Sequence, residues 1–368
     1  MTDPTLAQFI RRMPKVELHV HLEGSIQPET LLALARRNDV RLPADDVEGL
    51  RRWYQFTDFK HFIDIYLAIS SCICTPEDIE LVARDFLQGQ AAQNIRYSEI
   101  TFTPHTHFST NRRIPFDEQF DALTRARDWA AREFDTHCGW VFDVARNARP
   151  IEHSLTVAEW AISGKERGVV GFGLGGLEAG NPPEWFREAF DLARKAGLAA
   201  VPHAGEVAGA ESVRGAVEVL QARRIGHGVR CLEDPQLVEI LRARQIPLEV
   251  CPTSNVCLGV AASLAGHPLP RLLAEGLYVT INSDDPPMFN TTLTGEYLRI
   301  AETFRYDAEM IEQFVLNAAR ASLLPESARK ELAETLQLEM ADLKLRLEAA
   351  EKSRKSTNSL KLLDKRYI

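Results

Sequence analysis

The sequence predicts an α/β fold in the form of a (β/α)8 TIM barrel, and three observations favour it. Eight short apolar runs alternate with longer amphipathic stretches, as strands and helices do around a parallel sheet. The alternation extends over about 300 residues, which is the size range of a TIM barrel. Histidine and carboxylate side chains follow several of the runs directly, where such barrels place their active sites. A doubly wound open sheet is the alternative, because a count of strands does not close a barrel.

The predicted strands are short apolar runs of strand length. In chain order they are Lys15–Leu22, Ile95–Phe102, Gly139–Val144, Val169–Leu174, Ala199–His203, Arg224–His227, Pro247–Cys251 and Leu277–Ile281. Between most of them lie helical patterns, for example Pro183–Ala196, Ala210–Ala222, Pro235–Arg244 and Pro268–Glu275. Gly197 and Gly276 stand where a helix C-cap would release the chain into the next strand.

A long segment rich in aromatic residues separates the first two predicted strands. It covers about residues 30–93, and we expect it to form a helical insertion over the barrel mouth. Such an insertion can serve as a lid that excludes water from the site, or it can simply pack on the barrel; the two interpretations are compatible.

The C-terminal part of the sequence is charged and helical in pattern. We expect a helix over Ser327–Glu351, followed by a polar tail, Lys352–Ile368, that is flexible over 352–359. The sequence therefore predicts a barrel domain over 1–325 and an extension over 326–368. The extension would pack on the outside of the barrel or on a second subunit, so a homo-oligomer is one expectation.

Composition and charge exclude several classes of protein. The 368 residues are 45% hydrophobic and 26% charged, which is an ordinary globular composition. A net charge of −9 argues against a protein that binds nucleic acid through its phosphates. No run approaches the roughly 18 apolar residues of a membrane span, and the N-terminus lacks the apolar core of a signal peptide. Six scattered cysteines fit reduced thiols, so we expect a cytoplasmic protein.

Potential metal ligands stand at the ends of the predicted strands. His19 and His21 end the first strand, and the period of 2 in a strand points both imidazoles the same way. The later strand ends supply His203 with Glu206, then His227, then the pair Asp284 and Asp285. Each residue alone is more often structural. Their joint placement at one barrel mouth predicts a catalytic metal site.

The types of ligand favour one zinc ion. Imidazoles with one carboxylate suit zinc, with other first-row divalent ions as alternatives, and zinc lowers the pKa of its water to about 7. A two-metal hydrolase of similar shape would carry a bridging lysine at the end of the fourth strand. The segment 173–178 that ends this strand contains no lysine, so one metal is favoured over two.

Four sequence blocks resemble the signature blocks of the adenosine deaminase family, in the amidohydrolase superfamily. They cover residues 16–24, 203–206, 224–228 and 283–286, and their order and spacing match from roughly residue 15 to residue 317. The resemblance implies hydrolytic deamination of a 6-aminopurine nucleoside, which would be the small-molecule partner. It also implies one zinc per chain, held by His19, His21, His203 and Asp284.

The resemblance assigns further roles around the metal. His227 would orient the attacking water and help to take its proton, and Asp285 would hydrogen-bond purine N7. Glu206 would protonate purine N1, and must itself be protonated, so its pKa should be raised by burial or nearby negative charge. The backbone N–H of Gly176 would meet purine N3; a plain glycine loop is the alternative.

Two departures from the family pattern blur the substrate. Glu23 replaces an aspartate that meets the ribose 5′ hydroxyl, so we expect Glu23 to contact the tail of the substrate. Together with the run 285–289 that begins at the second aspartate, this pattern looks like bacterial members acting on adenosine or on 6-aminodeoxyfutalosine. Adenine deaminases of the family also have a glutamate at this position, but they usually show a different run after the aspartates. Gly173 stands where the family often places an aspartate. An adenine deaminase, another metal-dependent hydrolase and a non-catalytic metal-binding protein are the alternatives.

Two further patterns resemble metal sites. His105 and His107 form a second H-x-H, which we interpret as a solvated loop rather than a substrate contact. Cys251 and Cys257 flank a strand end, and we interpret them as part of a turn in the pocket wall rather than a zinc clasp.

Overall fold

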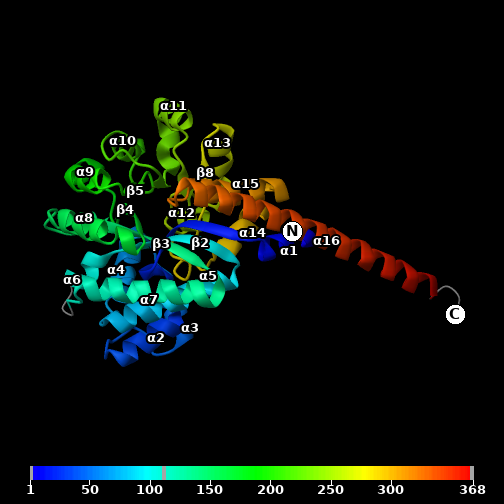
Figure 1. Ribbon diagram of the computed structural model, residues 1–368, viewed down its shortest axis with the longest axis horizontal. Helices are drawn as coiled ribbons and strands as arrows, with labels where there is room; N and C mark the ends of the chain where they lie inside the picture. Colours follow the sequence, from blue (N-terminus) through cyan, green and yellow to red (C-terminus); the bar gives the residue numbers. More distant parts are fainter. Residues whose placement is uncertain (1–2, 110–112, 365–368) are drawn as a thin grey trace.

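Eight parallel strands pair with one another in chain order. The computed structural model describes residues 3–109 and 113–364, with side chains up to residue 350 (Figure 1). The strands are β1 (Lys15–His21), β2 (Ile95–Phe102), β3 (His137–Ala145), β4 (Val169–Gly175), β5 (Ala199–Ala204), β6 (Ile225–His227), β7 (Leu248–Val250) and β8 (Val279–Ile281). Each predicted strand is present, and the last three are shorter than expected.

The sheet closes through the segment that follows β8. Val20 of β1 forms an isolated parallel bridge with Asp284. The His21 N–H donates to the Asp284 carbonyl at 3.0 Å, and the Asp284 N–H donates to the His19 carbonyl at 3.1 Å. The strand order and this closure confirm the TIM barrel and exclude the doubly wound sheet.

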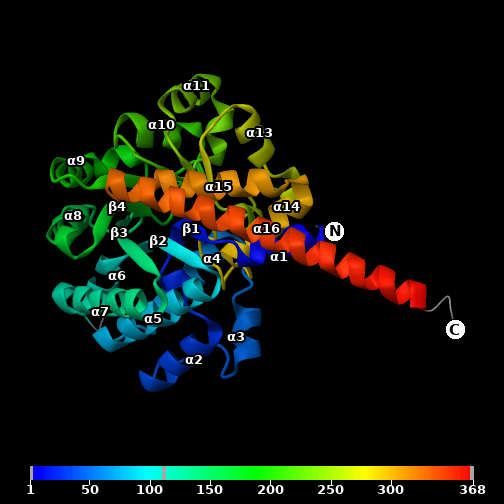
Figure 2. The same cartoon turned by 45° about the vertical axis from the view of Figure 1, so that its right-hand side comes forward.

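Helices surround the sheet, most of them between consecutive strands (Figures 1 and 2). Those outside the insertion are α1 (Pro4–Arg12), α6 (Pro104–Ser109), α7 (Phe116–Phe134), α8 (His153–Ser163), α9 (Arg187–Lys195), α10 (Ala210–Glu218), α11 (Pro235–Arg244), α12 (Pro252–Cys257), α13 (Leu269–Ala274), α14 (Leu293–Phe304), α15 (Ala308–Ala321) and α16 (Glu326–Asp364). Short 3-10 turns are η1 (Glu23–Ser25), η2 (Lys165–Arg167), η3 (Pro183–Phe186), η4 (Val229–Glu233) and η5 (Leu264–Gly266).

The expected helix ends agree with the backbone. Gly197 and Gly276 have φ of +86° and +69°, the left-handed conformation that glycine adopts without strain after a helix.

The insertion after β1 is helical and covers one side of the barrel mouth. Its helices are α2 (Pro28–Arg37), α3 (Val47–Trp53), α4 (Phe59–Ser70) and α5 (Pro76–Ala92). A reciprocal capping box of Thr75 and Asp78 begins α5. Phe62 of α4 stacks on Phe289 beyond β8, with ring centroids 5.5 Å apart. This contact packs the insertion against the segment that follows β8.

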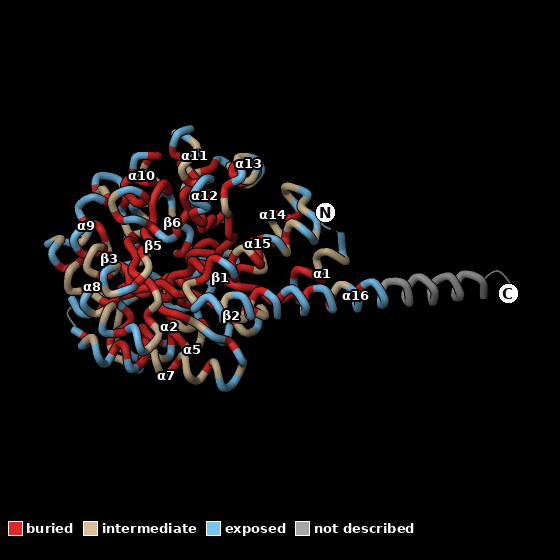
Figure 3. Tube along the Cα trace, turned by 45° about the horizontal axis from the view of Figure 1, so that its top comes forward, coloured by how far each residue is buried: buried red, intermediate tan, exposed pale blue. Residues whose placement is uncertain are grey.

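The last helix, α16, packs beside α15 and then projects beyond the barrel (Figures 1 and 2). The part of α16 that lies against the barrel has both buried and exposed residues (Figure 3). Its buried side chains include Leu336, Met340 and Leu343. The helix continues to Asp364, although the sequence predicted a polar tail from residue 352; this segment contains several helix-forming Lys, Arg and Leu residues. The expected flexibility of 352–359 concerns residues whose side chains lie outside the described part. None of the described helices is long and apolar enough to span a membrane.

Candidate metal and active site

Four predicted ligands meet at the mouth of the barrel. His21 Nε2 lies 3.1 Å from His203 Nε2, and His19 Nε2 and His21 Nε2 each lie 3.4 Å from Asp284 Oδ1. All four side chains are buried, and one ligand atom of each lies within 4.8 Å of the others. The side chains come from the ends of β1 and β5 and from the segment after β8, so the barrel itself brings them together.

The spacing of these atoms fits one metal ion. Ligand atoms of a tetrahedral zinc site, with bonds of about 2.1 Å, lie about 3.4 Å apart. His19 Nε2 is buried without a hydrogen-bond partner, which is costly unless an ion binds it. Ser254 Oγ donates to Asp284 Oδ2 at 2.7 Å, so Asp284 Oδ1 faces the imidazoles.

The protonation of the imidazoles also suits a cation. Burial lowers the pKa of His21 to about 4 and the pKa of His203 well below its ordinary value, so both are neutral at neutral pH. Burial opposes protonation of His19 too, but the carboxylates of Asp284 and Glu249 outweigh it and raise its pKa to about 10. A divalent cation at His19 would replace that proton between the same carboxylates.

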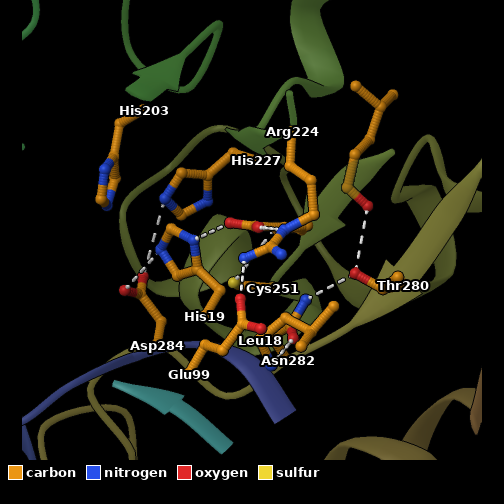
Figure 4. A network of polar contacts seen from close by, with 12 residues as sticks. Leu18, His19, Glu99, His203, Arg224, His227, Cys251, Thr280, Asn282 and Asp284 are labelled. Atoms are coloured by element: carbon orange, nitrogen blue, oxygen red, sulfur yellow. Dashed lines mark hydrogen bonds and ion pairs between the residues drawn. The ribbon is translucent and has the colours of Figure 1, made fainter. Parts of the chain in front are cut away.

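A chain of buried polar contacts orients the His19 ring through its Nδ1 atom (Figure 4). Glu249 Oε2 accepts from His19 Nδ1 at 2.8 Å, and Glu249 Oε1 accepts from the Arg224 guanidinium. Arg224 also donates to Glu99 at 2.5 Å and to the Ala321 carbonyl at 2.9 Å. A carboxylate at Nδ1 directs Nε2 of the same ring to the metal position. Sequence reasoning missed Glu249, although a charged residue in the middle of a buried strand is a signal.

Glu206 lies beside the four candidate ligands, in a loop whose backbone N–H groups are bound by another carboxylate. The side chain of Glu178 accepts from four consecutive backbone N–H groups, those of residues 205–208, at 2.6–3.1 Å. Glu206 Oε1 is 3.4 Å from His227 Nε2. Burial raises the pKa of Glu206 well above its ordinary value, and the charges of Asp284 and Glu178 raise it further. A protonated Glu206 is the form required of an acid.

Asp285 approaches the backbone of Gly24 closely. A Cβ at Gly24 would lie 1.6 Å from Asp285 Oδ1, so only glycine leaves room for this carboxylate. Asp285 Oδ1 is buried without a partner, and the side chain lines the cavity. Burial raises the pKa of Asp285 well above its ordinary value, with further contributions from Asp284 and Glu206.

Two functional candidates have left-handed backbone. His227 has a φ of 60° and Asp284 has a φ of 65°. Non-glycine residues in this region carry strain of about 1–3 kcal/mol, which clusters at active sites. The turns after β6 and β8 thus hold these side chains in orientations that a regular strand would not allow.

The cavity beside the cluster encloses about 700 Å³, a volume that includes solvent at its open mouth. Phe59, Phe62 and Leu67 of α4 form an apolar wall, consistent with the expected covering role of the insertion. The cavity is also lined by the candidate residues His21, Gly176, His203, Glu206, His227, Asp284 and Asp285.

Glu23 is placed differently from the other candidates. It is buried and does not line the cavity. Its Oε1 accepts from the Thr103 N–H and faces His107 Nε2, both at 3.0 Å, and its Oε2 accepts from the Tyr66 hydroxyl at 3.4 Å. The interpretation of His107 as part of a solvated loop is therefore wrong: it lies buried in α6 because it pairs with Glu23. A second group of potential ligands among the described residues consists of His227, Cys251 and Asp284. Cys257 is exposed and belongs to neither group, so the two cysteines do not form a zinc clasp together.

Asp143, at the end of β3, is a cavity residue that the sequence analysis missed. It is buried and lines the cavity, and its Oδ1 accepts from Thr103 Oγ at 2.6 Å. A Cβ on Gly173 would lie 2.9 Å from the Asp143 Cβ, and one on Gly175 would lie 2.5 Å from its Oδ2. The glycines of β4 thus leave space that the Asp143 carboxylate fills. The sequence contained one signal for this arrangement, namely Gly173, which stands where the family often places an aspartate.

Comparisons with known proteins identify the family of this chain. The adenosine deaminase family model matches residues 14–338. An adenine deaminase of Cupriavidus necator is 41% identical over 329 residues, 89% of this chain and 93% of its own length. An aminodeoxyfutalosine deaminase of Streptomyces coelicolor is 41% identical over 334 residues, 90% of this chain and 85% of its own. The crystal structure of an adenine deaminase from Arthrobacter aurescens superposes with a TM-score of 0.84 at 34% identity, covering 88% and 98% of the chains. This chain belongs to the adenosine deaminase family.

Proposed function

We propose that the protein is a zinc-dependent hydrolase that deaminates a 6-aminopurine nucleoside. The single observation that carries the proposal is the position of Glu206, a carboxyl group with a raised pKa, beside the buried cluster of three imidazoles and Asp284. Imidazole and carboxylate donors suit zinc. When bound there, zinc would make water a nucleophile near neutral pH.

The other residues then bind and orient the purine. Glu206 donates its proton to N1, which makes C6 electrophilic, while Asp285 and the backbone N–H of Gly176 hold N7 and N3. The oxygen of water bonds to C6, and the carboxylate left on Glu206 can take a proton from that water. The amino group leaves as ammonia after receiving a proton from the new hydroxyl, so the products are a 6-oxopurine and ammonia. His227 orients the attacking water.

The cavity wall supports a nucleoside rather than a free base. With N1 at the β5 end, N3 at β4 and N7 beyond β8, N9 must face the ends of β1–β3. On that side the cavity is lined by Asp143, Thr103, Thr106 and Asn147, which can hydrogen-bond hydroxyl groups. Glu23 would influence the group attached to N9 only through Thr103, whose backbone N–H donates to the Glu23 carboxylate.

A substrate panel tests the proposal. Metal-replete protein is assayed for ammonia release from adenine, adenosine, 2′-deoxyadenosine, 5′-methylthioadenosine and 6-aminodeoxyfutalosine. We expect turnover of one or more nucleosides. Asp143→Ala should reduce kcat/KM for them by about tenfold, the effect of losing one hydrogen bond, with a much smaller effect on adenine. Turnover of adenine alone would make the protein an adenine deaminase, and no turnover of any 6-aminopurine would refute the proposal.

A further inference from the structure

A buried chain of hydrogen bonds runs from the start of α13 to the ring of His227. The backbone N–H of Leu269 donates to His267 Nδ1 at 3.0 Å. His267 Nε2 lies 3.0 Å from Asn255 Oδ1, and Asn255 Nδ2 lies 3.3 Å from His227 Nδ1. The three side chains are buried, so water does not compete for these contacts.

The direction of this chain is set by its first member. A backbone N–H can only donate, so His267 Nδ1 accepts, and a neutral His267 carries its hydrogen on Nε2. Burial lowers the pKa of His267 to about 4, which keeps this ring neutral. Asn255 must then present its oxygen to His267 and its NH₂ group to His227. The reverse orientation of the amide would set a donor against a donor in a buried site.

His227 Nδ1 therefore accepts a hydrogen bond, and its hydrogen is on Nε2. That nitrogen faces the reaction site, 3.4 Å from Glu206 Oε1 and 3.9 Å from Asp284 Oδ2. A second hydrogen on Nδ1 would point at the Asn255 NH₂ group, so the chain also opposes the doubly protonated ring.

We propose that Asn255 and His267 are positioning residues that hold His227 as the Nε2–H tautomer, so that His227 donates a hydrogen bond to the attacking oxygen and does not act as its base. This inference rests on the proposed function for the identity of that oxygen. The sequence analysis expected His227 to orient the water and to help take its proton; the tautomer retains the first role and removes the second. The nearest carboxylate to His227 Nε2 is then Glu206, which can accept the water proton once it has protonated N1.

The tautomer is measurable directly. Zinc-loaded protein labelled with 15N-histidine is studied by NMR, and the His227 signals are identified by their loss in His227→Gln. We expect Nε2 to carry the hydrogen and Nδ1 to show the shift of an unprotonated acceptor. A hydrogen on Nδ1, or on both nitrogens at neutral pH, would overturn the proposal. The measurement is independent of whether a 6-aminopurine is the substrate.

Asn255→Asp replaces the NH₂ group that donates to His227 Nδ1 with an oxygen that can only accept from it. The new carboxylate still accepts from His267 Nε2 but requires a hydrogen on His227 Nδ1, which leaves Nε2 without its hydrogen or makes the ring a cation. We expect the NMR signature to change accordingly, and kcat to fall by about a hundredfold, as for loss of one donor to a reacting oxygen. KM and zinc content should change little.

The control is Asn317→Asp in α15, whose amide donates to the Val279 carbonyl at 3.0 Å, outside the cavity. It should leave the His227 signature and kcat unchanged. Unchanged or faster turnover of Asn255→Asp would refute the donor role. If that variant does not fold, His267→Ala, which removes the group that orients the amide, should give a mixture of tautomers; a pure Nε2–H signal there would also count against the proposal. If wild-type protein deaminates no 6-aminopurine while His227 is the Nε2–H tautomer, the proposed function fails, and the donor role falls with it.

Discussion

Neighbouring carboxylates take different protonation states within one buried site. Asp284 faces three imidazoles; burial alone would raise its pKa, but contact with His19 and the nearby rings holds it well below the ordinary value. For Glu206 and Asp285 the balance is reversed: burial and the charges of neighbouring carboxylates raise the pKa of each. The difference in surroundings supports the proposed roles of Asp284 as a metal ligand and of Glu206 in proton transfer.

Glu206→Gln tests the acid. The amide keeps the shape but cannot donate a proton to N1 in the same way, so kcat should fall by roughly a hundredfold to ten-thousandfold. Zinc content and melting temperature should stay close to those of the wild type, because Glu206 is not a ligand. A variant that retains more than about a tenth of wild-type kcat would show that another group supplies the proton.

The dependence of activity on pH should have an alkaline limb due to the same residue. The acid form of Glu206 is present below its raised pKa and is lost as the pH rises through it, so kcat/KM should decline in that direction. Glu206→Gln should lack this limb. A wild-type rate that keeps increasing with pH through the alkaline range would contradict the role of Glu206 as an acid.

Glu249→Gln tests the support of the metal site. Replacing the carboxylate at His19 Nδ1 should weaken zinc binding by about tenfold to a hundredfold, measured by competition with a chelator. Glu296→Gln is the matched control, because Glu296 is equally buried and instead accepts from the Thr253 N–H. Equal zinc affinity in Glu249→Gln and wild type would show that Glu249 only stabilises the fold.

The sequence could point to the four candidate ligands because they lie at or directly after the ends of strands, whereas it could not point to the residues that hold them in place. His19 and His21 reveal themselves by a period of 2 within one strand. Glu178 and Asp143 act on partners 27 to 40 residues away, through turns whose geometry no local pattern specifies. Glu23 shows the same limit: the sequence places it near the site, but only the structure shows that His107 and Tyr66 enclose it.

At the scale of elements, α16 has two faces with different roles. Leu336 is fully buried against the barrel, whereas Leu338, two residues further, is 72% exposed. In a helix, residues two apart point in different directions, so the pattern assigns only one face to packing. The sequence predicted a packed helix here but not which leucines it buries, nor that the helix continues to Asp364.

Leu336→Ala and Leu338→Ala form a matched pair on this helix. Leu336→Ala should lower the free energy of unfolding by about 2–5 kcal/mol, because it leaves a cavity in the core. Leu338→Ala should change it by less than about 0.5 kcal/mol. Denaturant unfolding of the zinc-loaded proteins measures both. Equal losses would indicate that Leu338 is buried in solution, for instance against a second subunit.

At the scale of the whole molecule, closure of the barrel and assembly of the metal site depend on the same residue. Asp284 forms the bridge that joins the end of the sheet to β1, and its carboxylate faces the imidazoles of His19 and His21. The strand count in the sequence could not show this closure, because it depends on one backbone bridge outside the predicted strands. A metal at this position would stabilise the closed barrel over the unfolded chain.

The central claim is that one metal ion at this cluster supports deamination. Metal-free protein titrated with Zn²⁺, with ammonia release from its best 6-aminopurine substrate followed at each addition, tests it most directly. We predict no ammonia without metal and a linear rise in rate that ends at one equivalent per chain. A rise that continues to two equivalents, or no ammonia from any 6-aminopurine at full loading, would contradict the claim.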